Sequence, residues 1–237
     1  MYYQFVFIVI SFWQFMQPSA IATKHKMNSD SAVIAINVLL KPDEKLAELA
    51  YQTNARFLQE YVQGFPLDET HVPHITLVQR YIYVSDLEKV IQAVSKMIKD
   101  TNSLNLKVKG FKSSKWETEG VAVLEVENSL ELDLLEQKIV NAVHPFSVNG
   151  GNASAFVPND NGIAIGQKII KYVDEFVPMH SNSNYSPHLT IGLADTAFLH
   201  KLDQEPFSLF YFKPSAIAIY QLGDHGTARK ELWSQKF

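Results

Sequence analysis

The chain has 237 residues, 46% of them hydrophobic and 19% charged, with a formal net charge of −4. This composition is typical of a soluble globular protein with a sizeable core, and it excludes a disordered chain. The net negative charge argues against a protein that coats a long nucleic-acid polymer, while a small nucleotide or an RNA end could still bind. The lack of cysteine excludes disulfides, thiolate nucleophiles and zinc–thiolate sites.

Residues 1–22 differ from the rest of the chain, because a short apolar run without charged side chains is followed by small residues that end at Ala22. This pattern predicts a secretory signal peptide cleaved after Ala20 or Ala22, although no Lys or Arg precedes the apolar run. The run is short for a membrane span, so no stable span is expected; an uncleaved anchor and a buried N-terminal element are the alternatives. We therefore expect an exported protein, periplasmic or secreted, with a linker at 23–30 and one bilobal domain at 31–237.

The apolar periodicity of this domain predicts alternating strands and helices, and hence a mixed α/β, or α+β, fold. In chain order the predicted elements are a strand at 32–40, a helix at 41–64, a strand at 73–77, a helix at 85–99, a hairpin of strands at 104–111 and 121–126, a helix at 128–143, a loop at 145–162, a helix at 166–177, a strand at 187–191, a short helix at 195–202 and closing strands at 209–222 and 228–237. Ser85 with Glu88 has capping-box spacing, and Asn128 with Glu131 suggests another helix start.

One short pattern occurs twice in the chain: Pro73-His74-Ile75-Thr76-Leu77 and Pro187-His188-Leu189-Thr190-Ile191. On a strand, the period of two sends His and Thr to one face and the two apolar residues to the other. A single chance match has an expectation of roughly 0.04, so two matches that both follow proline are far rarer. For either copy alone, an ordinary strand whose outward face carries His and Thr is the better explanation. For the pair, a shared functional site is the better explanation.

Brought together, the two strands would form a pocket with two imidazoles and two hydroxyls. Histidine has an ordinary pKa near about 6.5, so one copy can be neutral while another is protonated, and a pair can act as general base and general acid. We expect His74 and His188 to act on opposite sides of a phosphorus atom, with Thr76 and Thr190 donating to its non-bridging oxygens. Nothing in this scheme requires a metal ion or a cofactor.

These two His-apolar-Thr-apolar motifs resemble the signature of the two-histidine (2H) phosphoesterases, which include 2′-5′ RNA ligases and cyclic nucleotide phosphodiesterases. The resemblance spans roughly residues 31–237. It implies a two-lobed, pseudo-twofold fold with antiparallel sheets that face a central cleft and helices outside. It also implies hydrolysis, or ligation in reverse, at 2′,3′-cyclic or 2′-5′ phosphodiester bonds. The predicted export signal and the long loop before the second motif depart from many relatives and bear on the physiological substrate.

The two motifs, together with what this resemblance implies, predict a metal-independent phosphodiesterase that hydrolyses 2′,3′-cyclic phosphates of nucleotides or RNA ends. The alternatives are a 2′-5′ RNA ligase or 2′-5′ phosphodiesterase, and a non-catalytic protein that binds nucleotides or RNA ends. A small nucleotide or RNA end is the expected partner, and we expect a monomer.

Three further candidate features also have ordinary structural explanations. Tyr185 could stack on a base, as could Tyr83 or Trp116, although an aromatic side chain beside a strand more often belongs to the core. His71 lies three residues before His74, a spacing that on a strand points the two to opposite faces, so a metal site is not expected there. A basic cluster could attract a phosphate or be a solvated strand edge, where Lys is common. Its members are Lys107, Lys109, Lys112 and Lys115.

Overall fold

The computed structural model describes residues 31–99, 104–115 and 117–237. The predicted signal peptide and linker, at residues 1–30, lie outside these described residues, and so does Trp116. None of the helices in the described ranges is long and apolar enough to cross a membrane.

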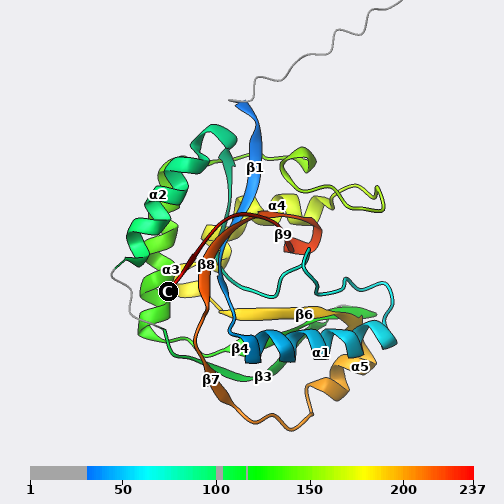
Figure 1. The fold of residues 1–237 in the computed structure, drawn as a ribbon. Coiled ribbons are helices and arrows are strands. Elements are labelled where there is room, and N and C mark those ends of the chain that lie inside the picture. The colour runs from blue at the N-terminus through cyan, green and yellow to red at the C-terminus, as the bar shows by residue number, and fades with distance from the viewer. Residues whose placement is uncertain (1–30, 100–103, 116) are drawn as a thin grey trace, which may run out of the picture.

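The described chain forms a strongly curled, nine-stranded antiparallel sheet (Figure 1). The strand order is β7-β3-β4-β6-β2-β1-β8-β9, and the short β5 pairs with β2. The sheet therefore divides into two lobes of four strands, β7-β3-β4-β6 and β2-β1-β8-β9, which meet where β6 pairs with β2. The strands are β1 (Val33–Lys41), β2 (Ile75–Tyr83), β3 (Leu106–Lys115), β4 (Glu119–Val126), β5 (Ser147–Val148), β6 (His188–Asp195), β7 (Phe210–Phe212), β8 (Ala216–Leu222) and β9 (Ala228–Lys236).

Five α-helices pack around the described sheet, which confirms the predicted α+β, two-lobed architecture (Figure 1). They are α1 (Glu44–Glu60), α2 (Leu87–Ile98), α3 (Leu130–Val143), α4 (Gln167–His180) and α5 (Thr196–Leu202). Helices α1 and α5 pack on the lobe that contains β6, whereas α3 and α4 pack on β2 and α2 packs on α3. The chain after β1 thus crosses at once to the other lobe.

The N-cap residues of two helices differ from the predicted ones. Helix α2 begins at Leu87, because a 3₁₀ turn at Val84–Asp86 precedes it, and its N-cap is Asp86. Helix α3 is capped by Ser129, whose hydroxyl accepts a hydrogen bond from the Leu132 backbone N–H, and not by the predicted Asn128. Both N-caps lie one residue after the predicted ones, and only Ser129 accepts a capping hydrogen bond through its side chain.

The predicted closing strand at 209–222 is in fact two strands in different lobes. Strand β7 pairs with β3, and β8 pairs with β1. Pro214 lies between them, and a proline cannot donate to a strand ladder. The backbone N–H of Ser215 instead donates to the Lys41 carbonyl, 2.9 Å away, at the start of the second lobe. The break lets the chain pass from one lobe to the other.

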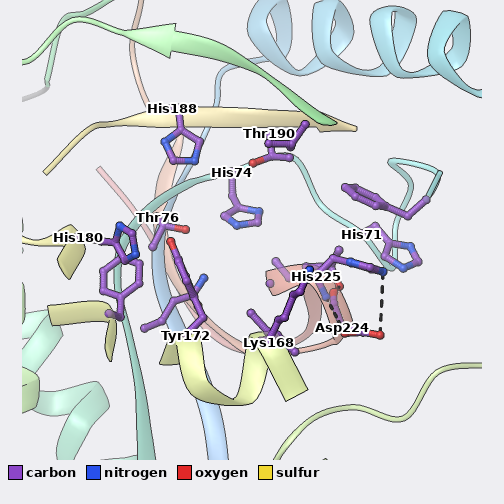
Figure 2. Close-up of a pocket in the computed structure, with 18 of the residues that line it drawn as sticks. His71, His74, Thr76, Lys168, Tyr172, His180, His188, Thr190, Asp224 and His225 are labelled. Carbon is purple, nitrogen blue, oxygen red and sulfur yellow. Dashed lines mark hydrogen bonds and ion pairs between the residues drawn. The ribbon is translucent and has the colours of Figure 1, made fainter. Parts of the chain in front are cut away.

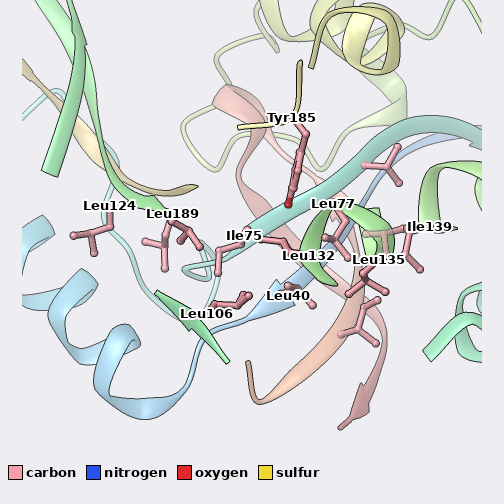
Figure 3. Close-up of a cluster of buried hydrophobic side chains, with 14 of the residues drawn as sticks. Leu40, Ile75, Leu77, Leu106, Leu124, Leu132, Leu135, Ile139, Tyr185 and Leu189 are labelled. Carbon is pink, nitrogen blue, oxygen red and sulfur yellow. The ribbon is translucent and has the colours of Figure 1, made fainter. Parts of the chain in front are cut away.

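The hydrophobic core lies behind the junction of the two lobes (Figure 3). The apolar residues of both repeated motifs are fully buried there: Ile75, Leu77, Leu189 and Ile191. Burying one such side chain contributes about 1.5–3 kcal/mol, so each motif fastens its strand to the core. This confirms the predicted apolar face of both motifs.

Candidate active site

The two motif strands are direct neighbours in the sheet. Strands β2 and β6 pair antiparallel at Ile75 and Leu189, the middle residue of each motif. Continuing this register sets the histidine of each motif beside the threonine of the other, related by a local twofold axis (Figure 2). All four polar side chains line one cavity of about 590 Å³; we call them the His–Thr quartet: His74, Thr76, His188 and Thr190.

The same β-bulge interrupts both motif strands. Between β1 and β2 the pairing shifts by one residue so that Leu77 is left over, and between β4 and β6 the same shift leaves over Ile191. Each of these residues is the fourth of its motif, counted from the histidine. A bulge bends its strand and turns the following side chains to a new face. Consequently Gln79, three residues after Thr76, also lines the cavity, which a regular strand would not allow.

Both histidines are held by the same hydrogen bond. The Nδ1 atom of His74 lies 2.7 Å from the Val72 carbonyl oxygen, and Nδ1 of His188 lies 2.7 Å from the Ser186 carbonyl oxygen. A carbonyl can only accept, so each Nδ1 carries the proton and donates it. The Nε2 atom of each neutral ring is then the one with a free lone pair. The two motifs therefore present matching imidazoles with one nitrogen available for proton transfer.

The surroundings of the quartet lower the pKa of both imidazoles. Burial lowers the pKa of His74 from 6.5 to about 4; the bond to Val72 opposes this shift, and the nearby His188 adds to it. Burial also lowers the pKa of His188, and its bond to Ser186 opposes the shift, while His180 and Lys112 lower this pKa further. In the free protein both rings are therefore neutral near pH 7.

Thr76 is fixed on two sides. Its hydroxyl oxygen accepts a hydrogen bond of 3.0 Å from the side-chain amide of Asn37, and its carbonyl oxygen accepts one of 3.0 Å from the Tyr185 hydroxyl. Tyr185 lines the cavity but is only 7% exposed, so little of its ring is available to a base. Its stacking role stays a prediction.

Several cavity residues escaped the sequence analysis (Figure 2). Tyr172 and His180, from α4, lie on one side of the quartet, with ring centroids 4.6 Å apart. His225 lies on the other side, as does His71, which the sequence suggests only as a candidate metal ligand. Helical spacing makes Tyr172 look like an ordinary core residue, and His180 and His225 carry no motif, so no local signal distinguishes them.

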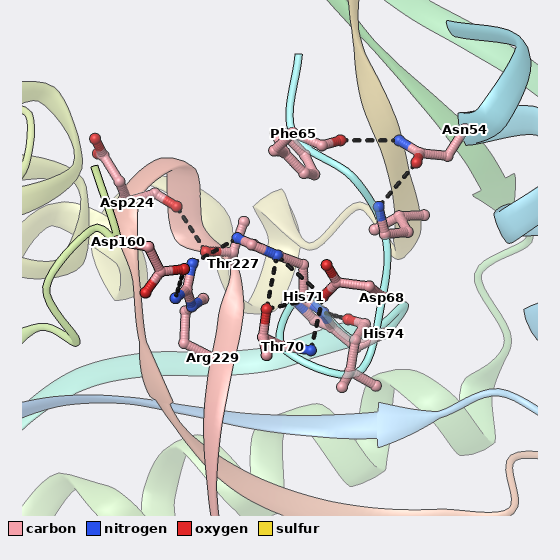
Figure 4. Close-up of polar contacts among 12 residues, drawn as sticks. Asn54, Phe65, Asp68, Thr70, His71, His74, Asp160, Asp224, Thr227 and Arg229 are labelled. Atoms are coloured by element: carbon pink, nitrogen blue, oxygen red, sulfur yellow. Dashed lines mark hydrogen bonds and ion pairs between the residues drawn. The ribbon is translucent and has the colours of Figure 1, made fainter. Parts of the chain in front are cut away.

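The expectation that His71 and His74 point to opposite faces is wrong. Strand β2 begins only at Ile75, so residues 71–74 do not follow the strand period, and both histidines line the cavity. Nε2 of His71 lies 2.7 Å from Nη1 of Arg229, and its Nδ1 lies 3.2 Å from Oδ1 of Asp68 (Figure 4). Since arginine can only donate, Nε2 accepts from Arg229 and Nδ1 donates to Asp68.

Both nitrogens of His71 are thus engaged, and Arg229 also donates to Asp160 at 3.0 Å (Figure 4). Across 31–99, 104–115 and 117–237, no group of three or more His, Asp or Glu side chains is placed to hold a metal ion. The His71–Arg229 contact instead ties the segment before the first motif to β9 beside the cavity.

The four lysines of the predicted basic cluster lie along β3, and each forms an ion pair. Lys107 pairs with Glu127 at 2.9 Å, Lys109 and Lys112 both pair with Glu125 at 3.4 Å, and Lys115 pairs with Asp203. None of them lines the cavity. This arrangement favours the solvated-edge interpretation of the cluster.

Comparison with known proteins identifies the family of this chain and the fold that it shares. A sequence model of the 2′-5′ RNA ligase superfamily matches residues 42–206, well over half of the chain. A search of curated proteins finds no match to this chain. Among solved structures, the crystal structure of TT0787 of Thermus thermophilus has a TM-score of 0.54 at 11% identity, covering 86% of this chain and 97% of that one. This likeness shows a shared fold.

Two further structures are less similar. Escherichia coli LigT complexed with ATP has a TM-score of 0.46 at 11% identity, covering 87% of this chain and 99% of that one. Kluyveromyces marxianus Usb1 has a TM-score of 0.40 at 10% identity, and the match covers 89% of this chain and 100% of that one. On the family match and its two motifs, the chain belongs to the 2′-5′ RNA ligase superfamily of two-histidine phosphoesterases.

Proposed function

We propose that this protein is a metal-independent phosphodiesterase that hydrolyses 2′,3′-cyclic phosphates of nucleotides or RNA ends. The observation that carries the proposal is the matched pair of Nδ1 hydrogen bonds, 2.7 Å each at His74 and His188. They leave two Nε2 atoms free over one cavity that also holds two threonine hydroxyls. This is the set of groups that an acid/base attack on a phosphodiester needs.

In the proposed reaction, one neutral imidazole takes a proton from water at Nε2 as the water oxygen bonds to phosphorus. The other imidazole, protonated at Nε2, gives its proton to the 2′ or 3′ oxygen as the bond from that oxygen to phosphorus breaks. The hydroxyls of Thr76 and Thr190 donate to the non-bridging oxygens, where negative charge increases. The product is a nucleoside phosphomonoester, and protons balance because one ring gains what the other loses.

The low pKa values fit this scheme once a substrate is bound. With both rings neutral in the free protein, a base is available at once, but the acid must first gain a proton. An anionic phosphate placed between the rings favours the protonated form of one of them. Binding of the substrate thus helps to create the acid that its own cleavage needs.

A second candidate is cleavage of a 2′-5′ phosphodiester. Such a bond carries a nucleoside on each side of its phosphate. The cavity likewise extends from the quartet both toward Tyr172 and His180 and toward His71 and His225 (Figure 2). Aromatic faces on both sides could each receive a base.

The proposal is tested with four 2′,3′-cyclic nucleotides and a 2′-5′ dinucleotide, each incubated with the protein in excess EDTA. We expect phosphomonoester product from the cyclic nucleotides. Activity that disappears with the chelator would overturn the metal-independent scheme, and cleavage of the dinucleotide alone would favour the second candidate. Tight binding without product would favour a non-catalytic binding protein.

The matched variants are His74→Asn and His188→Asn. An asparagine amide can still donate to the Val72 or Ser186 carbonyl but has no Nε2. We expect each variant to lower kcat by about 10²–10⁴-fold while the fold is kept. Full activity in either one would contradict the two-histidine mechanism.

Export is a separate proposal, which rests on the sequence of residues 1–22. N-terminal sequencing of protein recovered outside the cytoplasm tests it. We expect the mature chain to begin after Ala20 or Ala22, and an intact Met1 on membrane-bound protein would favour the anchor.

A further inference from the structure

Asn37 is an unusual residue for its position. It lies in β1, in a run that is otherwise apolar from Val33 to Leu40, and it is fully buried. Its Nδ2 atom donates to the Thr76 hydroxyl oxygen at 3.0 Å, but its Oδ1 atom has no hydrogen-bond partner among the described residues. A buried polar atom without a partner destabilises a fold, so an apolar residue would suit this place better if stability were the only requirement.

The hydrogen bond from Asn37 has a direction that matters to Thr76. A threonine hydroxyl has one proton and two lone pairs, and the amide N–H takes up one lone pair. The hydroxyl proton is therefore turned away from Asn37 and toward other acceptors. Thr76 lines the cavity, whereas Asn37 lies behind it and is not part of the lining. The proton of Thr76 is thus available to an acceptor in the cavity.

The two threonines of the quartet differ in this respect. In the part of the chain that the structure describes, Thr190 has no side-chain amide that donates to its hydroxyl. The Asn37 contact therefore breaks the local twofold symmetry of the motifs on one side only.

We propose that Asn37 is a positioning residue that fixes the Thr76 hydroxyl as a hydrogen-bond donor to a non-bridging phosphoryl oxygen. This inference rests on the proposed phosphodiesterase function and deepens it. Because charge on the phosphoryl oxygens increases during the reaction, a correctly directed donor acts mainly on kcat.

The first test replaces Asn37 by Leu, which has a similar size. We expect kcat for a 2′,3′-cyclic nucleotide to fall by about 10- to 100-fold, with a smaller change in KM. We also expect the melting temperature to stay the same or rise, since the variant removes a buried oxygen that lacks a partner. A purely structural role of Asn37 predicts instead that melting temperature and kcat fall together.

The second test is a double-mutant cycle with the two threonines. In a Thr76→Val background, Asn37→Leu should change kcat by less than about twofold, because the hydroxyl it positions is already gone. In a Thr190→Val background, the same substitution should keep its full effect. An equal loss of kcat in both backgrounds would overturn the inference.

Asn37→Asp provides a third measurement. An ionised carboxylate at this place accepts a hydrogen bond from the Thr76 hydroxyl and cannot donate one, so kcat should fall at least as far as with Leu. Wild-type kcat in this variant would contradict the role of the amide N–H. If Thr76→Val itself keeps full activity, the proposed role of Thr76 in the reaction fails, which is a different result from failure of the Asn37 inference.

Discussion

The Tyr185 hydroxyl donates a hydrogen bond of 3.0 Å to the carbonyl oxygen of Thr76. Tyr185 lies three residues before His188, in the loop that enters the second motif, whereas Thr76 belongs to the first motif. This contact links the two halves of the site directly. It also gives Tyr185 a structural role beside the predicted stacking on a base.

Tyr185→Phe separates the two roles, because phenylalanine keeps the ring and loses the hydroxyl. We expect this variant to be destabilised by about 1 kcal/mol and to lose part of its kcat, since the Thr76 carbonyl loses its donor. Urea unfolding and steady-state kinetics check both effects. Tyr211→Phe, at a 57% exposed position on β7, is the control and should change neither. A variant Tyr185→Phe with wild-type stability and kcat would leave only the ring contact as its function.

The pH dependence of kcat/KM should be bell-shaped, with an optimum below 6.5. One histidine must be neutral and the other protonated, and the pKa values of both are lowered from 6.5 in the free protein. The midpoint between two lowered pKa values is itself lowered. Measurement of kcat/KM from about pH 4 to about pH 9 checks this. An optimum above pH 7 would contradict the lowered pKa values of the two rings.

Acid should destabilise the fold through His74. Its pKa is about 4 in the folded protein and near 6.5 in the unfolded chain, so the unfolded chain takes up a proton first as the pH falls. The free energy of unfolding should therefore decrease from about pH 6.5 down to about pH 4, by up to about 3 kcal/mol from this group. The variant His74→Asn lacks this proton uptake. Its free energy of unfolding relative to the wild type should therefore increase as the pH falls over the same interval. Parallel pH profiles for the two proteins would contradict the lowered pKa of His74.

Lys107 and Lys109 of β3 should have little influence on catalysis. Lys107 and Lys109 pair with glutamates at the sheet surface and do not line the cavity. Exposed ion pairs contribute about 0–1 kcal/mol to stability. We expect the double variant Lys107→Gln, Lys109→Gln to keep kcat/KM within about twofold of the wild type at moderate salt. A large rise in KM would show that these side chains attract the phosphate.

The amino-acid sequence by itself determined most of the strands and helices and the apolar face of each motif. The periods of two and 3.6 residues are local properties of the chain, so the burial of Ile75 and Leu189 could be predicted without knowing their neighbours. The four polar residues of the motifs could be named for the same reason. That these four side chains share one cavity could be predicted only by assuming that the two motif strands lie side by side.

The tertiary structure decided everything that depends on pairing between distant segments. The bulges at Leu77 and Ile191 exist only relative to the partner strands, and the first of them brings Gln79 into the cavity. Asn37 reaches Thr76 because β1 pairs with β2. The sequence shows only one polar residue in an apolar run, and this contact could not be predicted from it. Strand register and cross-strand contacts depend on which distant segments pair, so a local sequence pattern cannot predict them.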